Sequence, residues 1–61
     1  LPGPLMLTVD PYGDQIALTL FADGIPFPLW TYSGMIPTEP MKVRTSWKGG
    51  EVTAYVSITT G

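Results

Sequence analysis

The side chains that could carry out chemistry in this chain are few. The sequence contains no histidine and no cysteine, so it lacks the usual general base, any disulfide and the ligands of an ordinary structural zinc site. Its acidic residues are Asp10, Asp14, Asp23, Glu39 and Glu51, all of which fall in predicted turns or loops. Asp10 and Asp14 flank one turn, but two carboxylates fall short of the roughly six to eight oxygens that calcium takes. We therefore predict a non-enzymatic protein with no catalytic, cofactor-binding or metal site and no small-molecule substrate.

Composition limits the possible partners. Apolar residues make up 44% of the 61 residues and charged residues only 13%, against about 25% in an average domain. This balance argues against disorder and predicts that a partner covers part of the surface. The net charge of −2 does not favour a nucleic-acid partner. No apolar run approaches the roughly 20 residues of a membrane span, so no membrane partner is expected.

The elements that would position any site are β-strands. Seven glycines and seven prolines recur throughout the chain and work against helix. Side chains alternate with a period of two in several segments, and Ile16, Leu18 and Leu20 share one face of the clearest strand. The predicted strands are 5–9, 15–21, 30–36, 41–48 and 51–59. Residues 10–14 are predicted to form a turn, and Asp23-Gly24 a hairpin turn.

The segment Ile25–Leu29 contains two prolines, which cannot donate main-chain hydrogen bonds. It must therefore be a sheet edge or an extended link outside the sheet. We predict that residues 1–4 are an extended lead-in and that residues 5–61 form a single small β domain. The chain begins with Leu1, so we expect it to be processed or part of something longer.

The strongest local prediction concerns the C-terminal hairpin. Gly49-Gly50 is a two-residue loop suited to a primed turn, which places Lys48 opposite Glu51. In that register one face is almost entirely apolar and the opposite face polar. The predicted apolar pairs are Trp47 with Val52, Thr45 with Ala54, Val43 with Val56, and Met41 with Ile58. The fold class predicted from all these elements is all-β, a small antiparallel sandwich or partly open barrel of four to five strands with a C-terminal hairpin.

Aromatic residues are the main candidates for a contact surface. A small β domain needs large side chains to close its core, which accounts for most of them. Phe21 nevertheless points away from Ile16, Leu18 and Leu20, and an aromatic side chain on a weakly charged outer face is typical of a protein interface. The predicted interface residues are Phe21, Phe27, Trp30, Arg44 and Tyr55.

Residues 13–36 carry a recognisable succession of motifs. Gly13-Asp14 precedes an alternating strand, Asp23-Gly24 follows it, and Pro26-Phe27-Pro28-Leu29 leads into an aromatic strand from Trp30 to Ile36. This succession resembles small Ig-like β-sandwich modules of phage tail, baseplate and tail-fibre-associated proteins. The resemblance implies a structural role in a virion, with no functional residues to carry over because such modules work by assembly.

Two functions follow as hypotheses. The first is a structural or assembly module of a virus particle, located in the virion as part of a phage tail or baseplate. Its partners would be other virion proteins or copies of itself, and neighbouring subunits would complete its small unstapled domain. The alternative is a small SH3-like or OB-like barrel adaptor that binds a peptide or single-stranded nucleic acid. Its contact strip would be Lys42, Arg44 and Lys48 beside Tyr55, since the three basic residues share one predicted face.

Overall fold

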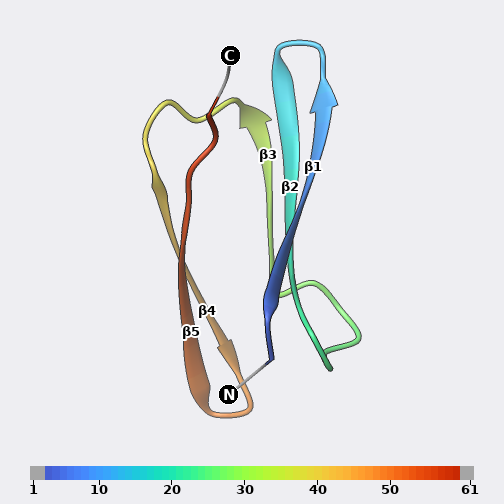
Figure 1. Cartoon of the computed structure of the whole chain (residues 1–61), viewed down its shortest axis with the longest axis vertical. Coiled ribbons are helices and arrows are strands. Elements are labelled where there is room, and N and C mark those ends of the chain that lie inside the picture. The colour runs from blue at the N-terminus through green and yellow to red at the C-terminus, as the bar shows by residue number, and fades with distance from the viewer. Residues whose placement is uncertain (1–2, 60–61) are drawn as a thin grey trace.

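The structure is a computed structural model that describes residues 3–59, and it is built from five antiparallel strands (Figure 1). The first two residues of the predicted lead-in and the last two of the predicted domain lie outside this range. The strands are β1 (Leu5–Tyr12), β2 (Gln15–Ala22), β3 (Trp30–Met35), β4 (Met41–Trp47) and β5 (Gly50–Val56). Within residues 3–59 there is no helix, and the predicted all-β class is confirmed.

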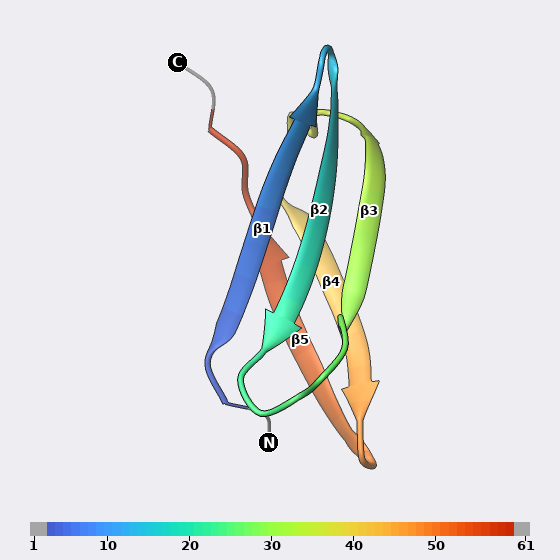
Figure 2. The ribbon, with the colours of Figure 1, turned by 90° about the vertical axis from the view of Figure 1, so that its right-hand side faces the viewer.

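The strands form two layers of unequal width. One sheet has the order β1-β2-β3 and the other consists of the β4–β5 hairpin. Turning the molecule shows β4 crossing behind β2 and β3, and β5 crossing behind β2 and reaching the middle of β1 (Figure 2). The arrangement is therefore a small, partly open sandwich that ends in a C-terminal hairpin.

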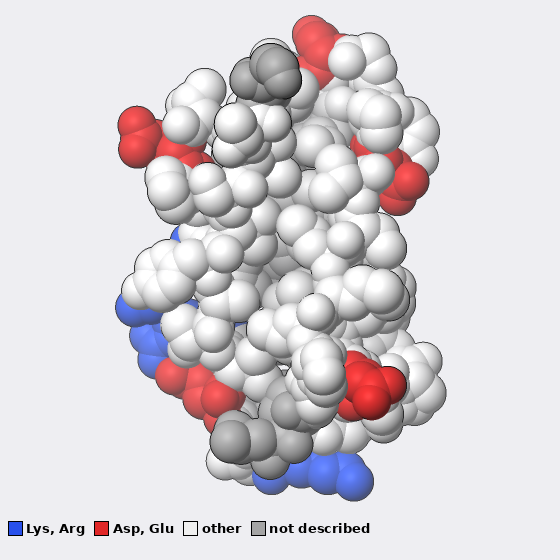
Figure 3. Space-filling model, viewed as in Figure 1, with Lys and Arg blue, Asp and Glu red and all other residues white. Residues whose placement is uncertain are grey.

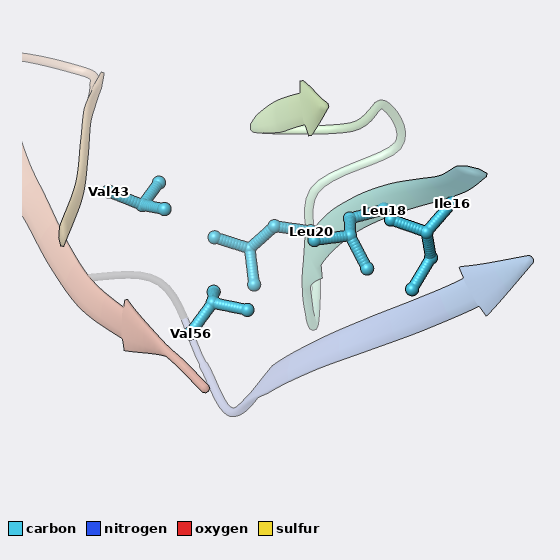
Figure 4. Close-up of a cluster of buried hydrophobic side chains, with 5 residues drawn as sticks. All are labelled: Ile16, Leu18, Leu20, Val43 and Val56. Atoms are coloured by element: carbon cyan, nitrogen blue, oxygen red, sulfur yellow. The ribbon is translucent and has the colours of Figure 1, made fainter. Parts of the chain in front are cut away.

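The core lies between the layers and is apolar. The alternation in β2 predicted its inward face, and Ile16, Leu18 and Leu20 are indeed buried. They meet Val43 from β4 and Val56 from β5, and Figure 4 shows Leu20 pointing across the gap toward both valines. Trp30 and Tyr32 of β3 pack against the same cluster. Because β2 is the central strand, its inward row carries most of the core.

Strand β1 is longer than the sequence predicted. The predicted turn at residues 10–14 is wrong, since Asp10, Pro11 and Tyr12 belong to the strand and only Gly13-Asp14 connects it to β2. Gly13 adopts a φ of 62°, the positive φ that such a tight loop requires. Proline is tolerated because β1 has no second neighbour in its sheet, so a missing N–H on that side breaks no ladder bond.

The connection from β2 to β3 is not a tight hairpin. Asp23-Gly24 does form a turn, with Gly24 at a φ of 80°, but seven residues separate Ala22 from Trp30. The two prolines of 25–29 explain this, because they prevent the segment from pairing with β2. The segment is the extended link that the sequence offered as one option. It reaches the other layer, where the Leu29 carbonyl accepts a hydrogen bond of 3.0 Å from the Thr45 hydroxyl.

The register of the C-terminal hairpin differs from the predicted one by two residues. Trp47 lies opposite Gly50 and Thr45 opposite Val52, so the loop is Lys48-Gly49 and the predicted pairing of Lys48 with Glu51 is wrong. Both loop residues have positive φ, 49° at Lys48 and 79° at Gly49, as a type I′ turn demands. The predicted inward face of the hairpin is nevertheless confirmed, since Val43, Val52 and Val56 are buried. A shift of two residues leaves every side chain on its original face, so alternation alone could not reveal the error.

Strand β3 ends with a close side-chain contact. The Tyr32 hydroxyl donates a hydrogen bond of 2.7 Å to the carbonyl of Met35. To reach it, the ring passes over Gly34, where an added Cβ would lie 3.1 Å from the hydroxyl oxygen. Glycine at this position therefore leaves room for the tyrosine to hold the end of the strand.

Candidate functional site

The core-facing side of β1 is left partly uncovered. Leu5, Leu7 and Val9 lie opposite Ala22, Leu20 and Leu18 in the register and so share the face of the buried β2 row. Leu18 and Leu20 are almost fully buried, yet Leu5 is 42% and Val9 is 46% exposed. Figure 2 shows that no described strand lies behind the lower part of β1, where this strand begins at Leu5. The two-stranded layer is too narrow to cover the three-stranded one.

The main chain of the same residues is also open. The Asp23 N–H donates to the Pro4 carbonyl at 2.9 Å, which makes Pro4 and Asp23 a hydrogen-bonded pair in the β1–β2 register. Bonded pairs recur at every second residue of an antiparallel ladder. The alternate residues Leu5, Leu7 and Val9 therefore direct their N–H and C=O groups away from β2. We call the side chains and free main-chain groups of these three residues the β1 edge.

The surface around the β1 edge carries little charge. Figure 3 views the molecule from the side on which β1 and β5 lie in front, and it shows charged side chains around the margin and an uncharged middle. An open hollow of about 450 Å³ lies at the start of β1, between Leu5, Met6, Phe21 and Ile25, and Asp23 is the one charged residue that lines it. Met6 is 60% exposed there. Apolar surface of this kind favours contact with another apolar surface.

Sequence reasoning identified Leu5, Leu7 and Val9 as a strand but did not recognise them as a contact surface. The signal that could have found them is Pro11, which follows in the same phase. A proline inside a strand must turn its nitrogen toward the side that has no neighbouring strand, so Pro11 marks β1 as an edge strand. Leu5, Leu7 and Val9 precede Pro11 at intervals of two residues, so their main-chain groups point to the same open side.

The five predicted interface residues do not form one surface. Phe21 is half-buried on the outer face of β2, opposite Met6. Phe27 is exposed in the β2–β3 link, and its ring contacts that of Trp47 edge-on at 5.0 Å between centroids. Trp30 is half-buried and packs against the core, with its ring stacked on Tyr32. Arg44 and Tyr55 lie apart from these three, exposed on the outer face of the β4–β5 hairpin.

The basic residues are partly occupied by other contacts. The Arg44 guanidinium lies 2.9 Å from the Glu51 carboxylate in an exposed ion pair. The Lys48 ammonium lies 5.4 Å from the centre of the Trp47 ring. Lys42 is opposite Tyr55, which is 70% exposed. The predicted contact strip therefore offers the exposed Tyr55 ring, whereas its Arg44 guanidinium is already paired with Glu51.

The described part of the chain contains neither a metal-binding cluster nor a membrane-spanning helix. Residues 3–59 contain no cluster of three or more acidic side chains that could hold a metal ion. No helix long and apolar enough to cross a membrane occurs in the described range. Within residues 3–59, the β1 edge combines two exposed apolar side chains on the core-facing side, Leu5 and Val9, with main-chain groups that point away from the neighbouring strand.

Comparison with models of known protein families, with curated proteins and with solved structures found no match to this chain.

Proposed function

We propose that this protein is a non-enzymatic assembly module of a virus particle, a component of a phage tail or baseplate, and that a neighbouring subunit covers its β1 edge. The observation that carries the assembly role is the exposure of Leu5 and Val9 on the core-facing side of the sheet. Side chains on that side of a sandwich are normally buried, so their exposure favours completion by another chain. The virion location rests on the succession of motifs in residues 13–36.

The chemistry of the edge supports strand addition in particular. An added strand would bond to the free N–H and C=O groups of Leu5, Leu7 and Val9. Every second side chain of that strand would then lie beside Leu5 and Val9 and extend the core. Main-chain bonds would supply affinity, and the apolar side chains would set the register.

The alternative, an adaptor for a peptide or single-stranded nucleic acid, has weaker support. Tyr55 and Lys42 are exposed side by side, as such a contact strip would need. However, Glu51 lies on the same outer face and pairs with Arg44, which reduces the attraction for a phosphate backbone. The hollow at the start of β1 is lined by no basic residue.

Two measurements test the proposal. Mass spectrometry of purified particles of the encoding virus should detect the chain at a fixed ratio to the known structural proteins. Hydrogen exchange should then show fast exchange of the Leu7 and Val9 amides in the dilute chain and slow exchange in the particle, because the neighbour's strand would bond them. The Thr8 amide points toward β2 and serves as the internal control. A chain absent from the particles, or β1 amides that exchange equally fast in both states, would contradict the proposal.

A further inference from the structure

The edges of this sandwich differ in how they resist pairing. The loop Lys48-Gly49 makes Trp47 and Gly50 a bonded pair, so Lys42, Arg44 and Ser46 direct their main-chain groups outward from β4. By the same alternation the outward residues of β5 are Glu51, Thr53 and Tyr55. Charged side chains on edge strands discourage pairing with another chain. Both edges of the hairpin are therefore protected.

The three-stranded sheet has one polar and one apolar edge. The residues of β2 that do not bond β1 must bond β3, so Thr31, Ser33 and Met35 point their main-chain groups outward from β3. On β1 the outward residues are Leu5, Leu7, Val9 and Pro11. The proline blocks pairing only near the end of the strand, and the other three carry no charge and no polar side chain. Strand β1 also has eight residues against six in β3. The β1 edge is thus the least protected of the four.

We propose that the β1 edge pairs with the β1 edge of a second copy of this chain, antiparallel and about a twofold axis that passes beside Leu7. This inference rests on the proposed assembly role and names the neighbouring subunit. Leu7 lies opposite Leu7 of the second copy, and Leu5 lies opposite its Val9. Each such pair exchanges two main-chain hydrogen bonds, and the two three-stranded sheets become one continuous sheet.

Proline selects this register over its neighbours. A twofold axis beside Thr8 would place Leu5 opposite Pro11, which has no N–H and would lose a bond in each such pair. An axis beside Met6 would place Val9 opposite Gly3, which lies outside β1. The axis beside Leu7 alone brings all three apolar residues into the ladder and leaves Pro11 beyond it.

Charge and burial agree with the same register. The one charged residue of β1, Asp10, lies opposite Pro4 of the second copy, so the two aspartates are not placed opposite one another. A twofold axis normal to the sheet leaves the core-facing surfaces of both copies on the same side of the joined sheet. Leu5 of each copy then contacts Val9 of the other, which covers the two side chains that the single chain leaves exposed.

Cysteine cross-linking tests the register directly, because the chain has no cysteine of its own. The Cα atoms of a bonded antiparallel pair lie about 5.5 Å apart, within the range that a disulfide spans. Under mild oxidation a mixture of Leu5→Cys and Val9→Cys chains should form a covalent dimer, whereas each variant alone should not. Leu7→Cys alone should form one.

A proline variant tests the use of the edge. Val9→Pro removes an N–H that points away from β2, as Pro11 already does, so the chain should keep its fold and lose the dimer. Thr8→Pro is the matched control, since it removes an N–H that bonds β2 and should unfold the chain. Far-UV circular dichroism reports the fold. Analytical ultracentrifugation up to about 1 mM should show the unmodified chain moving from monomer to dimer and Val9→Pro remaining a monomer.

The outcomes separate this inference from the proposed function. A monomer at every concentration, association that survives Val9→Pro, or a mixture of Leu5→Cys and Val9→Cys that does not cross-link would each overturn the twofold pairing. None of these results touches the proposed assembly role, which stands or falls on protection of the β1 amides in the particle. Association into chains longer than a dimer, if Val9→Pro abolishes it, would also overturn the twofold pairing while leaving the assembly role intact.

Discussion

The turn between β4 and β5 offers a sharp test of the structure, because two adjacent glycines occupy different environments. Gly49 has a φ of 79° in the loop, whereas Gly50 lies in β5 opposite Trp47. Substitution of either by alanine adds the same methyl group. The structure predicts opposite effects on the free energy of unfolding.

Gly49→Ala should destabilise the protein. A non-glycine residue in the left-handed region costs roughly 1–2 kcal/mol, and no neighbouring atom lies within 4 Å of an added Cβ to compensate or clash. In a domain of this size each kcal/mol corresponds to a fall in Tm of about 4–8 °C.

Gly50→Ala should be neutral or slightly stabilising. Its added Cβ would lie 3.5 Å from the Trp47 carbonyl oxygen, an ordinary contact distance. Alanine also reduces the conformational freedom of the unfolded chain, a gain of roughly 0.4–1 kcal/mol where the native backbone is compatible. The two variants should therefore differ by at least about 1 kcal/mol.

Lys48 completes the test, because it is the non-glycine residue with positive φ at the first loop position. Lys48→Asn should raise stability by up to about 1 kcal/mol, since asparagine tolerates this conformation and Asn-Gly suits a type I′ turn. Lys48→Ala is the control, since it removes the same long side chain without relieving the backbone. Equal losses in Gly49→Ala and Gly50→Ala would refute the reasoning and favour the Gly49-Gly50 loop. Thermal and urea unfolding at one fixed protein concentration would measure all four variants.

Three further substitutions test the core, the end of β3 and the surface. Leu18 is 1% exposed in the centre of the core, so Leu18→Ala should cost about 2–5 kcal/mol in urea unfolding, and a loss under 1 kcal/mol would contradict the packing described. Gly34→Ala should cost roughly 1–3 kcal/mol, because a φ of 158° is strained for alanine and the added Cβ would also lie 3.1 Å from the Tyr32 hydroxyl oxygen. A Tyr32→Phe background should reduce this cost only by the part due to the hydroxyl, and a cost that vanished there would contradict the backbone strain. Glu51→Gln removes the exposed ion pair with Arg44 and should change stability by at most about 1 kcal/mol, an effect that shrinks further in 1 M salt.

The β2 strand and the hairpin faces show how much of the fold could be predicted from local pattern. Ile16, Leu18 and Leu20 alternate with polar or smaller residues, and a period of two assigns them to one face whatever lies around them. The same reasoning correctly placed Val43 and Val56 inward. The same reasoning wrongly predicted a turn for Asp10 to Tyr12, which belong to β1, because proline is common both in turns and in edge strands.

The candidate site was harder to predict than the fold. An aromatic side chain on an outer face is typical of an interface, which is why Phe21 and Tyr55 are predicted contact residues. Leu5 and Val9 alternate as ordinary core residues do. Whether an inward-facing side chain is buried depends on the width of the opposite layer. That width depends on how many strands join each sheet, and no local sequence pattern specifies this number.

The sequence by itself determined the all-β class and the face on which each side chain of the central strand lies, because these depend on residues close together in the chain. Only the tertiary structure decided that the hairpin turns at Lys48-Gly49 and that the β1 edge stays open. A register shift of two residues conserves every face, so packing against the other layer had to choose between the two loops. The exposure of Leu5 and Val9 follows from a two-stranded layer facing a three-stranded one, which is a relation between distant strands.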